Sequence, residues 1–245
     1  MPFTFSHPSV VLVLKKFLPR LHLSATALIV GSIAPDFEGF LFLHTRKTFS
    51  HTWGGIFFFD MPIGIIICFL WHNMIKEGFI DNVPLYFKKK FYRYRSFDWN
   101  KYFSNHKIVV ITCLFIGAVT HLVWDDYTHF NGTDYTAVTV WHLEMSVFIF
   151  RQFMSSIVGF AFILLYVWFM PISVVVPTSR YHGYWFIVME VAAIGVFLRI
   201  LSTSMPTSSI LGYIDSIVMT FLSSLILGVL CSSIIFNIWK RNSIT

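Results

Sequence analysis

Residues 108–117, IVVITCLFIG, are an apolar run that continues without a break into AVTHLVWDDYTHF at 118–130. A helix needs roughly 20 predominantly apolar residues to cross a bilayer, and this stretch approaches that length. The run ends on four ionisable side chains: His121, Asp125, Asp126 and His129. The stretch therefore predicts a membrane-spanning helix with a polar group of residues at its mouth.

The composition of the whole chain agrees with a membrane location. Of its 245 residues, 56% are hydrophobic, 19% aromatic and 12% charged, and its mean hydropathy is +0.69. A soluble domain would carry about 25% charged residues. We therefore expect an all-α, polytopic helical membrane protein. Its three cysteines, which fall inside apolar runs without CxxC spacing, indicate small core residues.

Five to six transmembrane helices are expected. The five clearest spans are predicted over 53–74, 107–124, 152–176, 184–204 and 213–239. Residues 1–52 favour two short helices, and a sixth span over 21–43 is left open. We divide the chain into a metal-site module at 1–150, with these short helices and two spans, and three further helices at 151–245.

The basic residues predict the orientation of the spans. Eight of the 18 lysines and arginines lie in the connection 75–107, which indicates a cytoplasmic loop under the positive-inside rule, in contact with anionic lipid headgroups. This clustering favours the bilayer over nucleic acid as the partner of the net charge of +6. Four predicted spans separate this loop from Lys240 and Arg241, so the C-terminus is also expected inside. The acidic connection 125–150 is then expected outside.

The polar residues at the helix mouth have the spacing of a single column. His121, Asp125 and His129 are four apart, so a helix reaching that far would place all three on one face. A His-x-x-x-Asp pair can present an imidazole and a carboxylate to one divalent cation. The same pair is also common as an interfacial pair or helix cap, and spacing alone leaves both interpretations open.

A second polar group is expected on the same outer side. The segments GSIAPDFEGF and FSHTWGG carry Asp36, Glu38 and His51. Charged groups at membrane depth are costly unless they are paired or coordinated. Convergence of the two groups would favour a bound cation.

Four sequence blocks together resemble a known family. PFTFSHPSVVL, GSIAPDFEGFL, FSHTWGG and GAVTHLVWDDYTH, within the first 150 residues or so, are similar to the signature blocks of the bacterial membrane protein family DUF4184, a domain of unknown function. The resemblance implies a multi-pass protein of the bacterial inner membrane. That family in turn looks distantly similar to membrane-bound metal-dependent hydrolases.

The order of the polar residues is also similar to that of the zinc-dependent phospholipase C and zinc nuclease superfamily. Carried over by position, this second resemblance implies five metal ligands: His7, Asp36, His51, His121 and Asp125. His129, His142 and Glu144 would fill the later ligand positions of that superfamily. However, WHLEM has His-x-Glu where a helical His-x-x-x-Glu is expected. The sequence departs from the superfamily pattern at this point.

The leading hypothesis is a membrane-embedded, zinc-like metal-dependent hydrolase of phosphoesters, with a lipid-linked substrate entering from the leaflet. Asp36, His51, His121 and Asp125 would hold the ion, and His7 or His129 would complete its shell or serve a second ion. Asp126 or Glu38 would act as the base. The alternatives are a non-enzymatic protein with a structural or transported metal, and a metal-free membrane scaffold. Measuring the metal content of the purified protein distinguishes the metal-free scaffold from the two hypotheses that include a metal.

Overall fold

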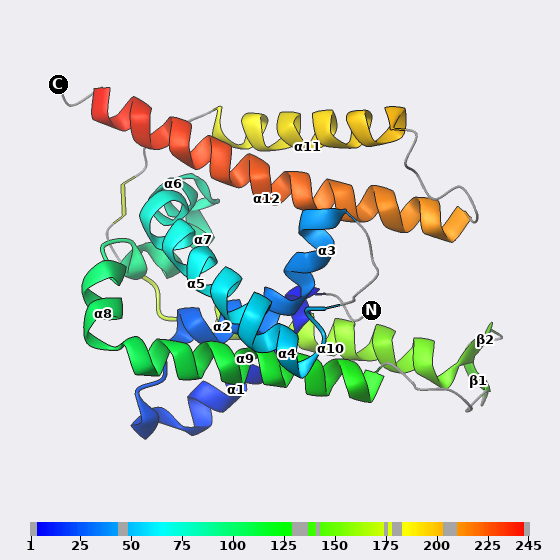
Figure 1. The fold of residues 1–245 in the computed structure, drawn as a ribbon. Coiled ribbons are helices and arrows are strands. Elements are labelled where there is room, and N and C mark those ends of the chain that lie inside the picture. Colours follow the sequence, from blue (N-terminus) through cyan, green and yellow to red (C-terminus); the bar gives the residue numbers. More distant parts are fainter. Residues whose placement is uncertain are drawn as a thin grey trace. The chain divides into compact units, whose positions relative to one another are not determined.

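The computed structural model describes residues 4–43, 49–128, 137–140, 143–173, 176–177, 183–202 and 210–242. The regular elements among these residues are helices, apart from a two-stranded antiparallel hairpin in which Ala137 pairs with Ser146 and Val140 with Leu143 (Figure 1). The elements in chain order are η1 (Thr4–Ser6), α1 (Pro8–Phe17), η2 (Pro19–Leu21), α2 (Ala25–Ile33), η3 (Ala34–Asp36), α3 (Phe37–Phe42), α4 (Trp53–Gly55), η4 (Ile56–Asp60), α5 (Met61–Leu70), η5 (Trp71–Ile75), α6 (Lys76–Asn82), α7 (Leu85–Phe91), η6 (Tyr92–Tyr94), α8 (Trp99–Asn105), α9 (Lys107–Thr128), β1 (Ala137–Val140), β2 (Leu143–Ser146), α10 (Val147–Trp168), α11 (Tyr184–Leu201) and α12 (Ile210–Asn242).

Six helical segments of the described chain are long and apolar enough to cross a membrane. They are Ala25–Phe42, Trp53–Asn82, Lys107–Thr128, Phe150–Trp168, Tyr184–Leu201 and Gly212–Lys240. The polytopic helical fold is therefore confirmed, and the sixth span that the sequence left open is Ala25–Phe42. The span predicted over 152–176 ends earlier, at Trp168, because Pro171 cannot continue a helix. The one predicted over 53–74 continues through α6 to Asn82.

Two compact units interleave along the sequence. Unit 1 comprises Met1–Asp36, Thr48–Ile66 and Asn105–Met170; unit 2 comprises Phe37–Lys47, Ile67–Ser104 and Pro171–Thr245. Each unit therefore gathers segments that are far apart in the chain. The predicted division at residue 150 concerns function, whereas these units are defined by packing, so that division stays a prediction.

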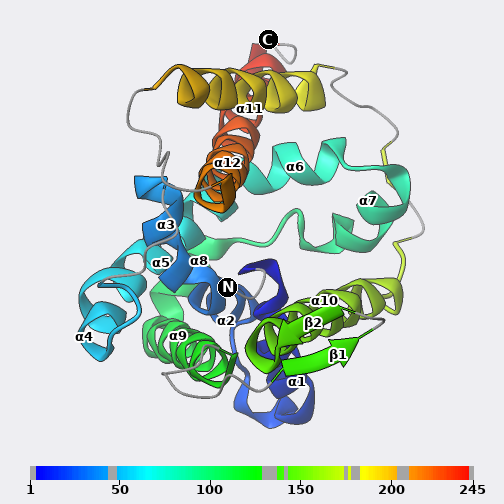
Figure 2. The same cartoon turned by 90° about the vertical axis from the view of Figure 1, so that its right-hand side faces the viewer.

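Unit 1 is organised around the close crossing of α2 and α9. At Gly31 a Cβ atom would overlap the Leu114 carbonyl oxygen, and at Gly117 it would lie 2.6 Å from the Leu28 carbonyl oxygen. Glycines at both positions let the two backbones touch, as small residues do between membrane helices. Helix α1 packs against α2 and α10, and α10 contacts α9 and η1 (Figure 2).

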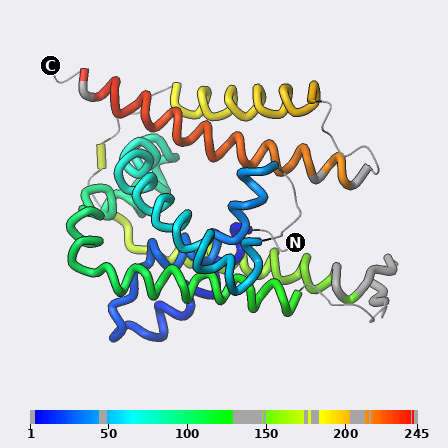
Figure 3. The backbone as a smooth tube through the Cα atoms, viewed as in Figure 1, coloured from blue at the N-terminus to red at the C-terminus, as the bar shows by residue number. Residues whose placement is uncertain are grey.

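Unit 2 is organised around α11, which lies along α12 (Figures 1 and 3). Tyr184, Val188 and Ala192 form the buried stripe of α11, and the Tyr184 hydroxyl hydrogen-bonds Ser233 on α12. The sequence of α11 contains two charged residues, Glu190 and Arg199, and because an unpaired charge is costly in lipid, both are expected to face the bundle interior or another helix. Arg199 does so, donating from Nε and Nη2 to the Ser216 hydroxyl at 3.0 and 2.8 Å. For Glu190 the expectation was wrong, because it lies on the exposed face of α11.

The predicted inner loop and the C-terminal end of α12 meet within unit 2. Glu77 accepts from Arg95 at 2.9 Å and from Lys240 at 3.3 Å. Arg95 also binds Asp81 through two hydrogen bonds, and this pairing raises the pKa of the Arg95 guanidinium. Part of the basic charge in the 75–107 connection is therefore neutralised by acidic side chains of the same unit.

Candidate metal centre

Helix α9 carries His121 and Asp125 on one buried face. The helix continues to Thr128, four residues beyond the predicted end of the span, so both residues lie on one rigid element. His121 is 0% exposed and Asp125 is 5% exposed. The predicted column is thus present as far as Thr128, and His129 lies outside the described residues.

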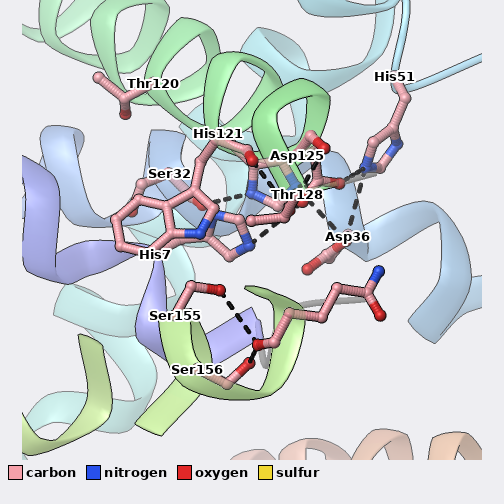
Figure 4. Close-up of polar contacts among 12 residues, drawn as sticks. His7, Ser32, Asp36, His51, Thr120, His121, Asp125, Thr128, Ser155 and Ser156 are labelled. Atoms are coloured by element: carbon pink, nitrogen blue, oxygen red, sulfur yellow. Dashed lines mark hydrogen bonds and ion pairs between the residues drawn. The ribbon is translucent and has the colours of Figure 1, made fainter. Parts of the chain in front are cut away.

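Five side chains of unit 1 converge around that face. His7 precedes α1, Asp36 ends η3, and His51 precedes α4. Together with the two residues of α9 they form what we term the His–Asp cluster: His7, Asp36, His51, His121 and Asp125 (Figure 4). All five were predicted from the sequence as candidate ligands.

The polar atoms of the cluster lie at closely similar distances from one another. His121 Nε2 is 3.6 Å from an Asp36 oxygen and 3.5 Å from an Asp125 oxygen. His51 Nε2 is 3.6 Å from the same Asp36 oxygen and 3.3 Å from the same Asp125 oxygen. His7 Nε2 lies 3.6 Å from the other Asp125 oxygen. The contacts are longer than ordinary N–H···O hydrogen bonds, which measure about 2.7–3.2 Å.

The spacing matches that of ligands sharing one metal ion. Two ligands at about 2.0–2.1 Å from a tetrahedral zinc ion lie about 3.3–3.4 Å apart. Two groups of three have ligand atoms within 4.8 Å of one another, namely His7, His121 and Asp125, and Asp36, His51 and His121. The described His and Asp side chains could therefore hold a metal ion, with His121 common to both groups.

Hydrogen bonds at the far ring nitrogens orient two of the histidines. The Ser32 carbonyl lies 2.8 Å from His121 Nδ1, and because a carbonyl only accepts, Nδ1 carries the proton. The Ser50 hydroxyl lies 2.9 Å from His51 Nδ1. Both rings thereby direct Nε2 toward the carboxylates. Metal-binding histidines are commonly held in this way by a backbone or side-chain partner.

His7 is held by its neighbours on α9. Its ring stacks on that of His121, with centroids 3.8 Å apart and planes inclined by 18°, and Trp124 lies 5.7 Å away. Ser6 and Pro8 beside it are buried. This packing holds the His7 ring in the cluster, against His121 of α9.

Other predicted candidates are not among the five residues of the cluster. Asp126 is exposed on α9, turned about 100° from Asp125. Glu38 is buried on α3, which belongs to unit 2, and is in neither group of three. His142 lies outside the described residues, and for Glu144 only the backbone, in β2, is described.

Sequence reasoning missed the supporting groups. The Ser32 carbonyl carries no side-chain signal, and Ser50 reads as an ordinary loop residue. Asp60 lies within the span predicted over 53–74. In the structure it is 1% exposed within the π-helical turn η4, which packs against η3 and α9. The signal in the sequence is an aspartate inside an apolar span, which marks Asp60 as a candidate functional residue.

Comparison with known proteins gives a family but no characterised relative. A family model described as a domain of unknown function matches residues 1–234. No curated protein and no solved structure matches the chain. The match covers every residue of the His–Asp cluster.

Proposed function

The chain belongs to the DUF4184 family, and from its His–Asp cluster we propose that it is a membrane-embedded, metal-dependent hydrolase of phosphoesters, with lipid-linked phosphoesters as the substrate class. The cluster would hold a divalent, zinc-like ion. The order of its residues is similar to that of the zinc-dependent phospholipase C and zinc nuclease superfamily, and this similarity supports the choice of phosphoesters.

The environment of His121 is the observation that carries the proposal. Its Nδ1 proton is directed to the Ser32 carbonyl, so the lone pair of Nε2 faces the carboxylates of Asp36 and Asp125. A buried lone pair between two anions is unfavourable unless a cation lies among them. A proton on Nε2 would favour shorter contacts than 3.5 and 3.6 Å. A metal ion fits the observed spacing.

The residues of this chain have distinct roles in the proposed reaction. Asp36, His51, His121 and Asp125 would be ligands, and His7 would complete the shell or serve a second ion. When bound, such an ion lowers the pKa of a coordinated water to about 7 and polarises a phosphoryl oxygen. The two carboxylates would neutralise the charge of a divalent ion. Asp126, exposed beside Asp125, would accept a proton at the rim.

Asp126→Asn should separate chemistry from metal binding. Protein purified in detergent without chelator should contain at least one zinc-like ion per chain and hydrolyse bis(p-nitrophenyl) phosphate. Because Asp126 points away from the buried face, the variant should keep its metal. Its rate should fall about 100-fold, as for loss of a general base. Elemental analysis and release of p-nitrophenol measure the two quantities.

The matched control is Glu190→Gln, which neutralises an exposed carboxylate in unit 2 and should leave both quantities unchanged. A protein that holds its metal but hydrolyses neither this diester nor p-nitrophenyl phosphate would favour a structural or transported ion. A protein without metal would favour a scaffold.

The proposed orientation places the cluster at the extracytoplasmic face of a bacterial inner membrane. The pairing of Glu77 with both Arg95 and Lys240 supports a common side for the basic connection and the C-terminus. Under the positive-inside rule that side is the cytoplasm. The C-terminal end of α9, with its cluster, would then face outward, where a lipid headgroup could enter from the leaflet.

Reporter fusions in a bacterial host test this orientation. A reporter after residue 245 or inserted at Lys89 should read as cytoplasmic, and one inserted at Thr133 as external. Labelling of cysteines introduced at the same positions, with a membrane-impermeant reagent, provides an independent measurement. External labelling at Lys89 would reverse the orientation and move the cluster to the cytoplasmic face.

A further inference from the structure

Glu190 is an acidic residue on the outward face of a helix that is long and apolar enough to span the membrane. Val188 and Ala192 of α11 are buried in unit 2, and successive residues of a helix turn by about 100°, so Glu190 lies roughly opposite both of them. It is exposed and forms no hydrogen bond or ion pair with any residue that the structure describes. Arg199, the other charged residue of α11, differs because it donates to the Ser216 hydroxyl.

The depth of Glu190 along this span makes an outward position costly. The span Tyr184–Leu201 rises about 1.5 Å per residue, so Glu190 lies about 9 Å from its first residue and about 17 Å from its last. The hydrocarbon core of a bilayer is about 30 Å thick, so this position lies within it. Ionisable side chains at such a depth almost always face protein or water. The outward face of α11 is therefore expected to be covered by protein.

The exposed residues around Glu190 have the spacing of a seam between two helices. They recur at alternating intervals of four and three, and we term them the α11 seam: Phe186, Glu190, Ala193, Phe197 and Ile200. A period of 3.5 residues lets two helices wind around each other, and a small residue such as Ala193 lets their backbones approach. Helix α10 also has an exposed face, but its exposed residues after Arg151 are all apolar, as lipid contact alone requires. The carboxyl group is what distinguishes α11.

A second copy of the chain is the partner that fits this seam. Copies that cross the membrane in the same direction present α11 in parallel, so a two-fold contact brings each residue of the seam to its own counterpart at the same depth. A protonated carboxyl group offers both a donor and an acceptor, so two of them can satisfy each other. A helix of another protein would need a cation at that depth, whereas a second copy supplies the matching group itself. We propose that the α11 seam is the interface of a homodimer in which the two Glu190 carboxyl groups pair.

Association of the full chain in phosphatidylcholine liposomes tests this interface. Chains carrying a donor or an acceptor fluorophore after residue 245 are reconstituted together, and energy transfer is followed as the ratio of lipid to protein is raised. Glu190→Ala should weaken association about tenfold or more, because the carboxyl pair is lost. Glu190→Gln should associate like the parent, since an amide also offers a donor and an acceptor. The matched control is Ile157→Ala, which shortens an exposed side chain of α10 and should change nothing.

Cysteine crosslinking tests the register of the seam in a chain that keeps Glu190. Ala193→Cys should form disulfide-linked dimers about tenfold faster or more than Leu198→Cys, which is also exposed on α11 but lies off the seam. The native cysteines are buried or half-buried, so the parent gives the background rate. Equal rates at the two positions, or a Glu190→Ala variant that associates as tightly as the parent, would overturn the proposal. A parent that is monomeric at every lipid ratio would also overturn it and would favour a cation-bearing helix of another protein as the partner of this face.

Discussion

A His121→Ala, Asp125→Asn double variant should lose its metal completely under conditions in which the parent retains at least one ion per chain. The first change removes the imidazole shared by both groups of three, and the second removes an anionic ligand while keeping its shape. We expect an affinity loss of at least about 1000-fold, or about 4 kcal/mol. Elemental analysis after dialysis against a weak chelator, followed by Zn²⁺ titration, measures it.

Asp126→Asn is the matched control because it removes a carboxyl group of identical chemistry one residue along the same helix. Its side chain is exposed, so its metal content should equal that of the parent. Asp36→Ala should lose the metal, because this carboxylate belongs to the second group of three. A double variant that binds Zn²⁺ as tightly as the parent would show that the cluster is only a buried network of polar side chains.

Residues within one element were the easiest to predict. The pairing of His121 with Asp125 follows from helical periodicity, and α9 needed only to continue four residues beyond the predicted span for both to be rigidly held. Asp36 and His51 required a further argument, from the positive-inside rule, that they share a side with the end of α9. His7 was identified only through resemblance, because no local pattern indicates that a short helix returns to the cluster.

The features that could not be predicted from the sequence depend on tertiary packing. A backbone carbonyl such as that of Ser32 is present at every residue, so only the crossing of α2 and α9 selects it as the partner of His121. Glu190 illustrates the converse. Its charge suggested an inward position, but the buried stripe of α11 is occupied by Tyr184, Val188 and Ala192, which leaves Glu190 on the opposite, exposed face.

The same packing argument makes Gly117 the position where one added side chain should do the most damage. Gly117 lies one turn before His121 on the face of α9 that meets α2. A Cβ atom there would lie 2.6 Å from the Leu28 carbonyl oxygen and 2.7 Å from the Ser32 amide nitrogen. These are backbone atoms that no rotamer change can move. Gly117→Val must therefore push the two helices apart, and with them the Ser32 carbonyl that orients His121.

Gly117→Val should cost about 3 kcal/mol or more, at the upper end for an overpacked core. For a chain of this length the loss corresponds to a fall of about 6–12 °C in the unfolding midpoint, measured by tryptophan fluorescence in detergent. Metal affinity should fall about 100-fold even where the variant stays folded, since the ring of His121 loses its partner. Gly54→Val is the control, because a Cβ atom there would contact only the Thr52 hydroxyl, at 3.8 Å. If both variants bound metal and melted alike, the α2–α9 crossing would not be what positions the cluster.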